Sequence, residues 1–315
     1  MPLNRNKIHY SLNEEQVPEH FREPFIYSGY RNPRSSFSLC IKSLFFPTNE
    51  TVNIWTHLIP AIYFIICFVS EIFYLNFRFD NYYYTPYIIY IATVVIYTLI
   101  SSLAHLFNTM SDWARHVCFI CDYAAVSIHA HGTGLAFYAY SLPISWIEKT
   151  SNKIFTNNYI IISIISCTVS VVLSCNTRFQ TASFRRKLLR FSAFMYPCLV
   201  TISPVLFRFL YCYIFDNTLN ATDDCKDDFY TNWIYQIFFS ILAVMFYISH
   251  FPERIYPGYF DILGHSHQLF HVTGTINTYF QIKLIRSDVF NRKVLLESYN
   301  KLPNFDNTYA PFMFV

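Results

Sequence analysis

Two histidines, His267 and His271, stand four residues apart at the start of the last hydrophobic segment. On a helix, residues with this spacing project from one face about one turn apart. Two imidazoles in this arrangement can bind one metal ion, as the two histidines of the H-E-x-x-H motif do. His265 lies two residues before His267, on the other side of the helix, and is a poorer ligand. A metal site therefore needs a third ligand from another part of the chain.

The composition indicates the environment in which such a site would lie. Of the 315 residues, 53% are hydrophobic, 20% aromatic and 14% charged, whereas charged residues usually make up about a quarter of a soluble domain. The apolar residues form runs of about 20, the length that spans a hydrocarbon core of about 30 Å. We therefore predict an all-α, integral multi-pass membrane protein. The net charge of +3, without a basic stripe, gives no reason to expect a nucleic-acid partner.

The apolar runs predict a seven-transmembrane helical bundle. We expect an amino-terminal segment at residues 1–51, a transmembrane domain at 52–285 and a carboxyl-terminal tail at 286–315. The expected spans are 54–75, 84–107, 117–140, 155–174, 188–213, 233–250 and 267–285. The seventh is polar for a span, so it is either shielded inside the bundle or re-entrant. The basic tail after it favours the cytoplasm. Seven spans that start from a cytoplasmic amino terminus would instead place this tail outside.

Charges in the loops predict the orientation, because Lys and Arg accumulate on the cytoplasmic side. The loop 174–190 carries five Lys and Arg residues and no acidic residue, so we expect it in the cytoplasm. The loop 214–232 carries one Lys, five Asp and the sequon Asn220-Ala221-Thr222, so we expect it outside. Counting spans back from these loops places the amino terminus in the cytoplasm.

With this orientation, polar residues of three spans lie at the cytoplasmic end of the bundle. Ser101 and His105 are four residues apart near the end of the second span and share a face. Asp122 lies near the start of the third span, and His267 and His271 begin the seventh. Ionisable residues inside a membrane are costly, and their presence indicates a functional site.

Three imidazoles with an open fourth position are the ligand set of a catalytic zinc ion, which lowers the pKa of its bound water to about 7. We predict zinc at His105, His267 and His271. Asp122 would then accept the proton of the bound water or orient a ligand. Each residue alone has another interpretation. His105 could bond a neighbouring helix, Asp122 could pair with Arg115 or a hydroxyl group, and the last two histidines could face water. The common depth of three separate segments favours the zinc site.

Other polar residues of the spans show no partner in the sequence. We expect His57, Glu71 and His131 to be ordinary polar groups of the bundle interior. We expect His129 to form a hydrogen bond between helices rather than to extend a proton path. Arg208, toward the outer end of the fifth span, is expected to extend its guanidinium to the membrane surface.

Several motifs occur in a fixed order along the chain: Arg22-Glu23-Pro24-Phe25-Ile26, Asn49-Glu50-Thr51-Val52-Asn53-Ile54-Trp55-Thr56-His57, Ser101-x-x-x-His105, Asp122-Tyr123, Pro252-Glu253-Arg254 and Gly264-His265-Ser266-His267-Gln268-x-Phe270-His271. In this order they resemble the progestin and adipoQ receptor family, whose members are adiponectin receptor-like and hemolysin III-related. The chain looks most similar to the fungal zinc-homeostasis branch of that family.

This resemblance implies a seven-span bundle with an intracellular amino terminus and a zinc ion near the inner leaflet. His105, His267 and His271 match the family's zinc ligands. Asp122 matches the acid that holds the zinc-bound water, and Ser101 matches the serine beside it. The resemblance also implies ceramidase-like amide hydrolysis and a link to zinc and to sterols or lipids. Departures from the family pattern, such as Ala104 where the family has Phe, remove no ligand but weaken the case for hydrolysis.

The sequence therefore predicts a receptor-like membrane protein of zinc and lipid homeostasis with a zinc-dependent lipid amidase site. One alternative is a sensor in which zinc is structural and the output is conformational. Another is a zinc transporter, which is less favoured because transporters bind ions near the midplane between repeats. We expect membrane lipids of the ceramide or sterol class as partners, together with an extracellular protein ligand. The expected location is the endoplasmic reticulum, another endomembrane or the plasma membrane.

Overall fold

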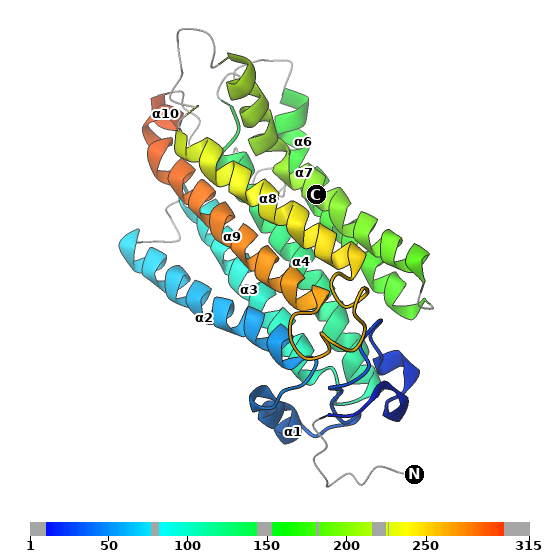
Figure 1. Ribbon diagram of the computed structural model, residues 1–315. Helices are drawn as coiled ribbons and strands as arrows, with labels where there is room; N and C mark the ends of the chain where they lie inside the picture. Colours follow the sequence, from blue (N-terminus) through cyan, green and yellow to red (C-terminus); the bar gives the residue numbers. More distant parts are fainter. Residues whose placement is uncertain are drawn as a thin grey trace. The chain divides into compact units, whose positions relative to one another are not determined.

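The computed structural model describes residues 11–76, 82–143, 153–180, 183–215, 225 and 227–298. The described residues are mainly helical and contain no strand, apart from a single bridge between Leu12 and Tyr30. Seven helices of 23 or more residues occur among them (Figure 1): α2 (Thr51–Tyr74), α3 (Thr85–Phe107), α4 (Asp112–Tyr140), α6 (Lys153–Asn176), α7 (Phe184–Phe215), α8 (Asp227–Ser249) and α9 (Ser266–Asn291). The prediction of an all-α fold is confirmed for this part of the chain.

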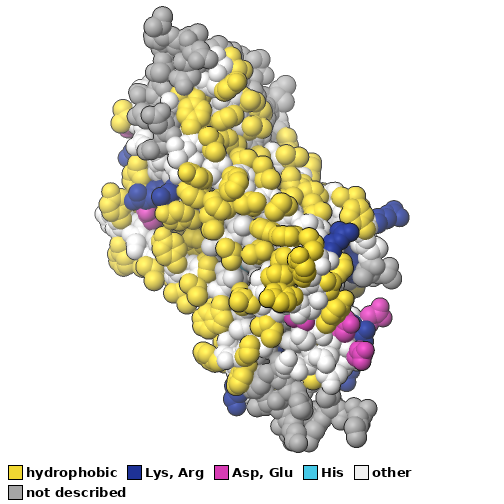
Figure 2. Space-filling model, viewed as in Figure 1, with side chains coloured by type: hydrophobic (Ala, Val, Ile, Leu, Met, Phe, Trp, Pro, Cys, Tyr) yellow, Lys and Arg dark blue, Asp and Glu magenta, His cyan; other side chains and the backbone are white. Residues whose placement is uncertain are grey.

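Five of these helices are long and apolar enough to cross a membrane: Thr51–Tyr74, Thr85–Phe107, Asn158–Phe179, Phe184–Ile214 and Phe229–Ser249. The other two, α4 and α9, form over the expected third and seventh spans and have 29 and 26 residues. Both exceed the length needed to span, but their polar side chains make them less apolar. Large hydrophobic side chains cover much of the described surface on the face shown in Figure 2, as a lipid-facing exterior requires.

The chain forms two compact units. Unit 1 comprises Met1–Tyr63, Ile96–Ala125 and Ile237–Asn277, and unit 2 comprises Phe64–Val95, Val126–Gln236 and Thr278–Val315. Because the boundaries fall inside the long helices, α2, α3, α4, α8 and α9 each contribute one part to unit 1 and another to unit 2.

In unit 1, the segment before α2 has its own small core. Leu12, Val17, Phe21, Ile26 and Tyr30 form a buried apolar cluster. The short helix α1 (Phe37–Lys42) lies near the start of α2 (Figure 1). A second cluster, Cys40 with Ile54 and Leu106, joins α1 to α2 and α3. The amino-terminal segment is therefore folded against the helix ends rather than trailing from them.

Gly29 fixes the path of this segment toward α2. Its φ of +82° is in the left-handed region that favours glycine. A Cβ atom at this position would lie 3.1 Å from the Asn49 backbone nitrogen and 3.2 Å from Ile262 Cγ1. The Asn49 N–H donates to the Gly29 carbonyl at 2.9 Å. This close approach sets the position of the residues that lead into α2.

In unit 2, α6 presents a row of buried serines at spacings of three and four residues: Ser163, Ser166, Ser170 and Ser174. Small side chains on one helix face allow neighbouring helices to approach closely in a membrane. Tyr159 also donates to the Thr201 carbonyl of α7 at 3.0 Å. Polar groups on α6 thus serve helix packing.

Unit 2 corrects the prediction for Arg208. Its side chain is 2% exposed instead of reaching the membrane surface. Its Nη1 lies 2.5 Å from Asp288 Oδ1, and its guanidinium lies 4.0 Å from the Phe229 ring centroid. Asp288 Oδ2 also accepts a hydrogen bond from the Ser141 hydroxyl at 2.6 Å. The prediction was wrong because a carboxylate on α9 offers Arg208 a partner inside the protein.

Two further polar residues have partners that the sequence did not reveal. Glu71 Oε1 lies 2.6 Å from Arg286 Nε. His131 Nδ1 lies 3.0 Å from the Ser163 hydroxyl. Both belong to unit 2, and each is paired with a residue of another helix. These contacts between helices are those of polar groups in the bundle interior, and only the identity of the partners was not visible in the sequence.

Candidate metal centre

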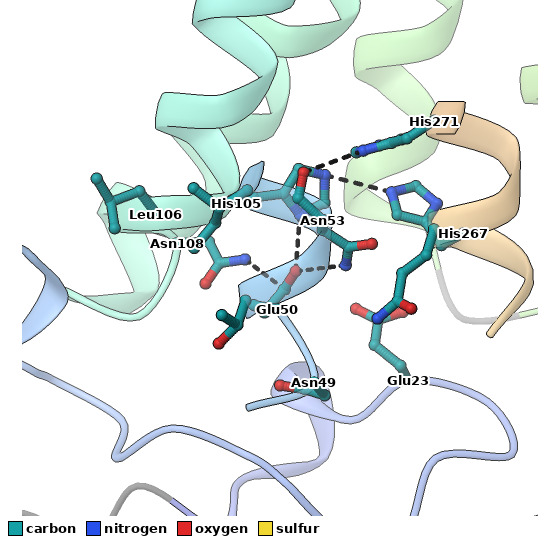
Figure 3. A network of polar contacts seen from close by, with 12 residues as sticks. Glu23, Asn49, Glu50, Asn53, His105, Leu106, Asn108, His267 and His271 are labelled. Carbon is teal, nitrogen blue, oxygen red and sulfur yellow. Dashed lines mark hydrogen bonds and ion pairs between the residues drawn. The ribbon is translucent and has the colours of Figure 1, made fainter. Parts of the chain in front are cut away.

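Three histidines of unit 1 come together as predicted (Figure 3). His105 is near the end of α3, and His267 and His271 are in the first turns of α9. One ring nitrogen of each lies within 4.8 Å of the others, and this is the single such group of His, Cys, Asp or Glu in the described part of the chain. The Nε2 atoms of His105 and His267 are 3.2 Å apart. His105 and His271 are each 2% exposed.

Hydrogen bonds on the far side of two of these rings fix their orientation. His105 Nδ1 lies 2.7 Å from Glu50 Oε2, and because a carboxylate only accepts, Nδ1 donates. His271 Nδ1 lies 3.2 Å from the Asn53 carbonyl oxygen, which also only accepts. Each ring therefore carries its proton on Nδ1 and keeps Nε2 as the nitrogen with a lone pair. This is how protein metal sites set the tautomer of their ligands.

One of the nitrogen–nitrogen distances matches the spacing of zinc ligands. Tetrahedral coordination with Zn–N bonds of about 2.0–2.1 Å separates neighbouring ligand nitrogens by about 3.3 Å. The observed separation between the Nε2 atoms of His105 and His267 is 3.2 Å. Imidazole nitrogens suit zinc, copper, iron and nickel, and three of them with an open position correspond to a catalytic zinc site. His105, His267 and His271 would hold the ion.

Glu50 supports His105 from behind. It is 7% exposed and also accepts from the side-chain amides of Asn53, at 2.8 Å, and Asn108, at 2.7 Å. Burial alone would raise the pKa of Glu50, but His105, Arg31 and Asn53 hold it well below its usual range. The carboxylate is therefore ionised at neutral pH.

Arg31 holds the backbone at His105. Its guanidinium donates to the carbonyl oxygens of His105, at 2.5 Å, and Leu106, at 2.8 Å, and to the Asn108 side chain at 2.7 Å. The last carbonyls of a helix have no partner within the helix, and a cation at this end is favourable. The amino-terminal segment thereby fixes the end of α3 that carries the first ligand.

Glu253 fixes the start of α9. It is 2% exposed and accepts hydrogen bonds from the Ser266 backbone N–H, at 2.7 Å, and from the Ser266 hydroxyl. Burial would raise the pKa of Glu253, but hydrogen bonds from His250 and Ser266 lower it. An ionised carboxylate at a helix amino terminus is stabilising. Because Ser266 precedes His267 directly, this contact sets the position of the second ligand.

Asp122 and Ser101 contact each other. Arg115 and His265, two other residues considered for the site, have partners elsewhere in unit 1. The Ser101 hydroxyl hydrogen-bonds to the Asp122 carboxylate, and Asp122 lies within electrostatic range of His105. Arg115, one suggested partner of Asp122, instead pairs with Glu23 at 2.9 Å. His265 lies outside the histidine group, as expected, with Nε2 3.1 Å from the Asn49 carbonyl.

The sequence reading missed the contribution of α2. His57, expected to have no convergent partner, stacks on His271 with ring centroids 3.8 Å apart. Glu50, Asn53 and His57 are all buried and follow one another at intervals of three and four residues. A polar stripe at helical spacing on an otherwise apolar helix is a recognisable signal. It would have indicated that α2 also faces the site.

Comparison with known proteins places the chain among membrane receptors. The haemolysin-III-related family matches residues 45–282. Membrane progestin receptor gamma-A of Danio rerio is 35% identical, covering 99% of this chain and 92% of the relative. Membrane progestin receptor gamma of Homo sapiens is 36% identical, with 91% and 84% covered. Membrane progestin receptor delta of Homo sapiens is 36% identical, with 92% and 82% covered.

These relatives agree with the five apolar helices in identifying an integral multi-pass membrane protein. The three relatives are vertebrate receptors, so placement in the fungal zinc-homeostasis branch stays a prediction. The motifs from Arg22 to His271, the histidine group and the match over residues 45–282 lead to one conclusion. The chain belongs to the haemolysin-III-related family, that is, to the progestin and adipoQ receptor family.

Proposed function

We propose that this protein is a receptor-like membrane protein that binds zinc at His105, His267 and His271 and acts in zinc and lipid or sterol homeostasis. The observation that carries the proposal is the 3.2 Å separation of two Nε2 atoms within a group of three ring nitrogens. The Nδ1 contacts of His105 with Glu50 and of His271 with Asn53 support it, because they leave Nε2 of both rings with a lone pair for a metal ion.

We further propose ceramidase-like amide hydrolysis at this centre. Bound zinc would supply Lewis-acid activation of a water molecule and of the amide carbonyl. Asp122, held by the Ser101 hydroxyl, would take the proton from the attacking water as general base. A long-chain lipid amide of the ceramide class fits a site of this kind inside a membrane bundle.

We propose that the chain crosses the membrane seven times, with its amino terminus in the cytoplasm. Support comes from the disulfide between Cys212, near the end of α7, and Cys225, just before α8. Disulfides persist in oxidising compartments such as the endoplasmic reticulum lumen and the cell exterior. Counting helices back from that side gives a cytoplasmic start of α2. We therefore propose an endomembrane of the secretory pathway or the plasma membrane as the location.

A second candidate function is a receptor in which the zinc is structural. The observation favouring it is that the similar proteins are named membrane progestin receptors. In that case a sterol-class lipid would be a ligand rather than a substrate, and the output would be conformational. A zinc transporter remains a weaker alternative, which zinc flux into proteoliposomes would support.

Metal analysis of the purified full chain tests the zinc site. We expect about one zinc per wild-type chain and none in a His267→Ala, His271→Ala double variant. His131→Ala is the matched control, because it removes a partly buried histidine of unit 2 that bonds Ser163 and should leave zinc unchanged. Equal zinc content in the double variant and wild type would overturn the proposal.

Asp122→Asn separates the two candidate functions. It should retain zinc and lose the release of free sphingoid base from ceramide if the centre is hydrolytic. If wild-type protein with zinc bound releases none, while a sterol-class lipid binds it equally well in both forms, the receptor function is favoured.

A further inference from the structure

A small cavity lies in unit 1 beside the support of His105. Its volume is about 10 Å³, and its walls include Arg31, Asn49, Glu50, Asn108 and Arg115. These residues come from the amino-terminal segment, the turn before α2, the end of α3 and the start of α4. A polar cavity of about 10–15 Å³ is the size that holds one water molecule.

Two hydrogen-bond donors on this cavity are unused among the described residues. The Nε atoms of Arg31 and Arg115 are buried and have no hydrogen-bond partner in the described part of the chain. Both side chains are about 4% exposed. Arg31 uses its Nη1 and Nη2 atoms at the end of α3, and Arg115 uses its Nη2 atom on Glu23. A buried N–H group without a partner is rare in a native structure and indicates a ligand or ordered water.

One acceptor position also remains on Glu50. A carboxylate can accept about four hydrogen bonds. Within the described residues Glu50 accepts three, from His105, Asn53 and Asn108. The residues that line the cavity therefore include two with an unused donor and one with an unused acceptor position.

We propose that this cavity binds one water molecule, which accepts hydrogen bonds from Arg31 Nε and Arg115 Nε and donates one to Glu50. Water satisfies this set because it both accepts and donates. A halide ion would satisfy the two arginines but would be repelled by the Glu50 carboxylate, and it is larger than the space available.

The water would connect Arg115 to the metal centre, whereas the direct ion pair of Arg115 is with Glu23. Arg115 would act through the water on Glu50, and through Glu50 on His105, as a positioning residue. The chain of contacts also continues outward, because Arg115 pairs with Glu23, whose side chain is 46% exposed. This part of the inference rests on the proposed zinc site, whereas the water site itself does not.

The test is a crystal structure of the full chain, grown in a lipidic mesophase, at about 2 Å resolution. We expect one density peak within about 2.7–3.2 Å of both Nε atoms. Arg115→Lys keeps the charge but lacks Nε, so the peak should vanish. Zinc dissociation constants, measured by competition with a chelator, should rise by about 3- to 10-fold, below the 10- to 100-fold typical of groups that bond a ligand directly. The cobalt(II) form should show a shifted visible spectrum, because that spectrum reports ligand geometry.

Arg34→Lys is the control, because Arg34 is 67% exposed and 3.8 Å from Asp112. It should leave the peak, the zinc affinity and the cobalt spectrum unchanged. Absence of a wild-type peak, with both Nε atoms bonded to protein atoms, would overturn the water site. So would a peak that acquires a bromide anomalous signal. An unchanged affinity and spectrum in Arg115→Lys would overturn the positioning role. If the wild type binds no zinc, the proposed function fails, and the density still decides the water site.

Discussion

Each unit of the protein buries ionisable side chains, but the two groups differ in how their hydrogen bonds are arranged. In unit 2, Arg208 and Asp288 form a direct ion pair at 2.5 Å. In unit 1, His105, His267 and His271 bring ring nitrogens within 4.8 Å of one another. The pair of unit 2 matches a donor to an acceptor. The group of unit 1 gathers acceptors, which need a cation or protons at their centre.

This difference shows how to read ionisable residues in apolar helices. Such residues suggest function by default, yet Arg208 and Asp288 neutralise each other as an ion pair. The histidines are different because Glu50 and Asn53 occupy the Nδ1 atoms of His105 and His271 and leave Nε2 of both rings with a lone pair. These unused lone pairs, rather than burial or charge, distinguish the candidate site from the structural pair.

The largest effect is expected from Asp288→Asn, which leaves the Arg208 charge buried without its counter-ion. Removing one partner of a buried ion pair costs about 3–5 kcal/mol. Unfolding in detergent, followed by helical circular dichroism, should show this loss, while the folded fraction retains its zinc. The double variant Arg208→Met, Asp288→Leu should recover much of the stability, because it removes both buried charges together. If the double variant is no more stable than Asp288→Asn, the loss of stability does not come from the unpaired charge of Arg208.

Glu50→Gln tests a buried charge that contacts the candidate metal centre, in contrast to the Arg208–Asp288 pair. Loss of the carboxylate behind His105 should weaken zinc binding by about 10- to 100-fold, which corresponds to about 1.4–2.7 kcal/mol. Chelator competition measures the effect. Glu71→Gln is a suitable control because that carboxylate pairs with Arg286 in unit 2. Equal losses of affinity in both variants would remove the distinction between the two kinds of charge.

Glu253→Gln should have a smaller effect. The variant keeps a hydrogen-bond acceptor for Ser266 but removes the negative charge at the start of α9. The interaction of a charge with a helix end is worth about 0.3–1 kcal/mol, and up to about 2 when partly buried. Thermal unfolding should therefore shift down slightly, and zinc affinity should fall less than in Glu50→Gln. A larger loss of affinity than in Glu50→Gln would reverse the order that we assign to these contacts.

The smallest effect is expected from Asp112→Asn, at the exposed contact between Asp112 and His20, 2.8 Å apart. Exposed pairs contribute about 0–1 kcal/mol. The hydrogen bond from His20 lowers the pKa of Asp112. Its contribution is therefore present above the ordinary Asp pKa of about 4 and is lost as the pH falls through the lowered folded value. The free energy of unfolding should be measured for variant and wild type at pH 7 and at pH 3. The difference between the two proteins should be smaller at pH 3.

The gathering of the three histidines could be predicted because it follows local rules. His267 and His271 share a helix face by spacing, and span counting brings His105 to the same depth. The helices themselves follow from long apolar runs, which have few alternatives in a bilayer. The polar character of α9 was also evident, and it is why hydropathy identifies five apolar helices among the described residues rather than seven.

The supporting contacts could not be predicted, because they join residues far apart in the sequence. Arg31 bonds Asn108, and Arg208 pairs with Asp288. Nothing near either arginine indicates its partner, so spacing rules give no information about them. The role of Glu50 is intermediate. Its place in the polar stripe of α2 was visible, but its contact with His105 required the tertiary fold.

The helix α9 begins at Ser266 and supplies two of the three metal ligands. A ribosome makes it after every other long helix in the described part of the chain. Until then the nascent protein has only His105 from this group, and one imidazole holds zinc weakly. At the proposed zinc site, metal loading would therefore belong to the final stage of biosynthesis, and a chain truncated before α9 would leave the translocon with only one of the three candidate ligands.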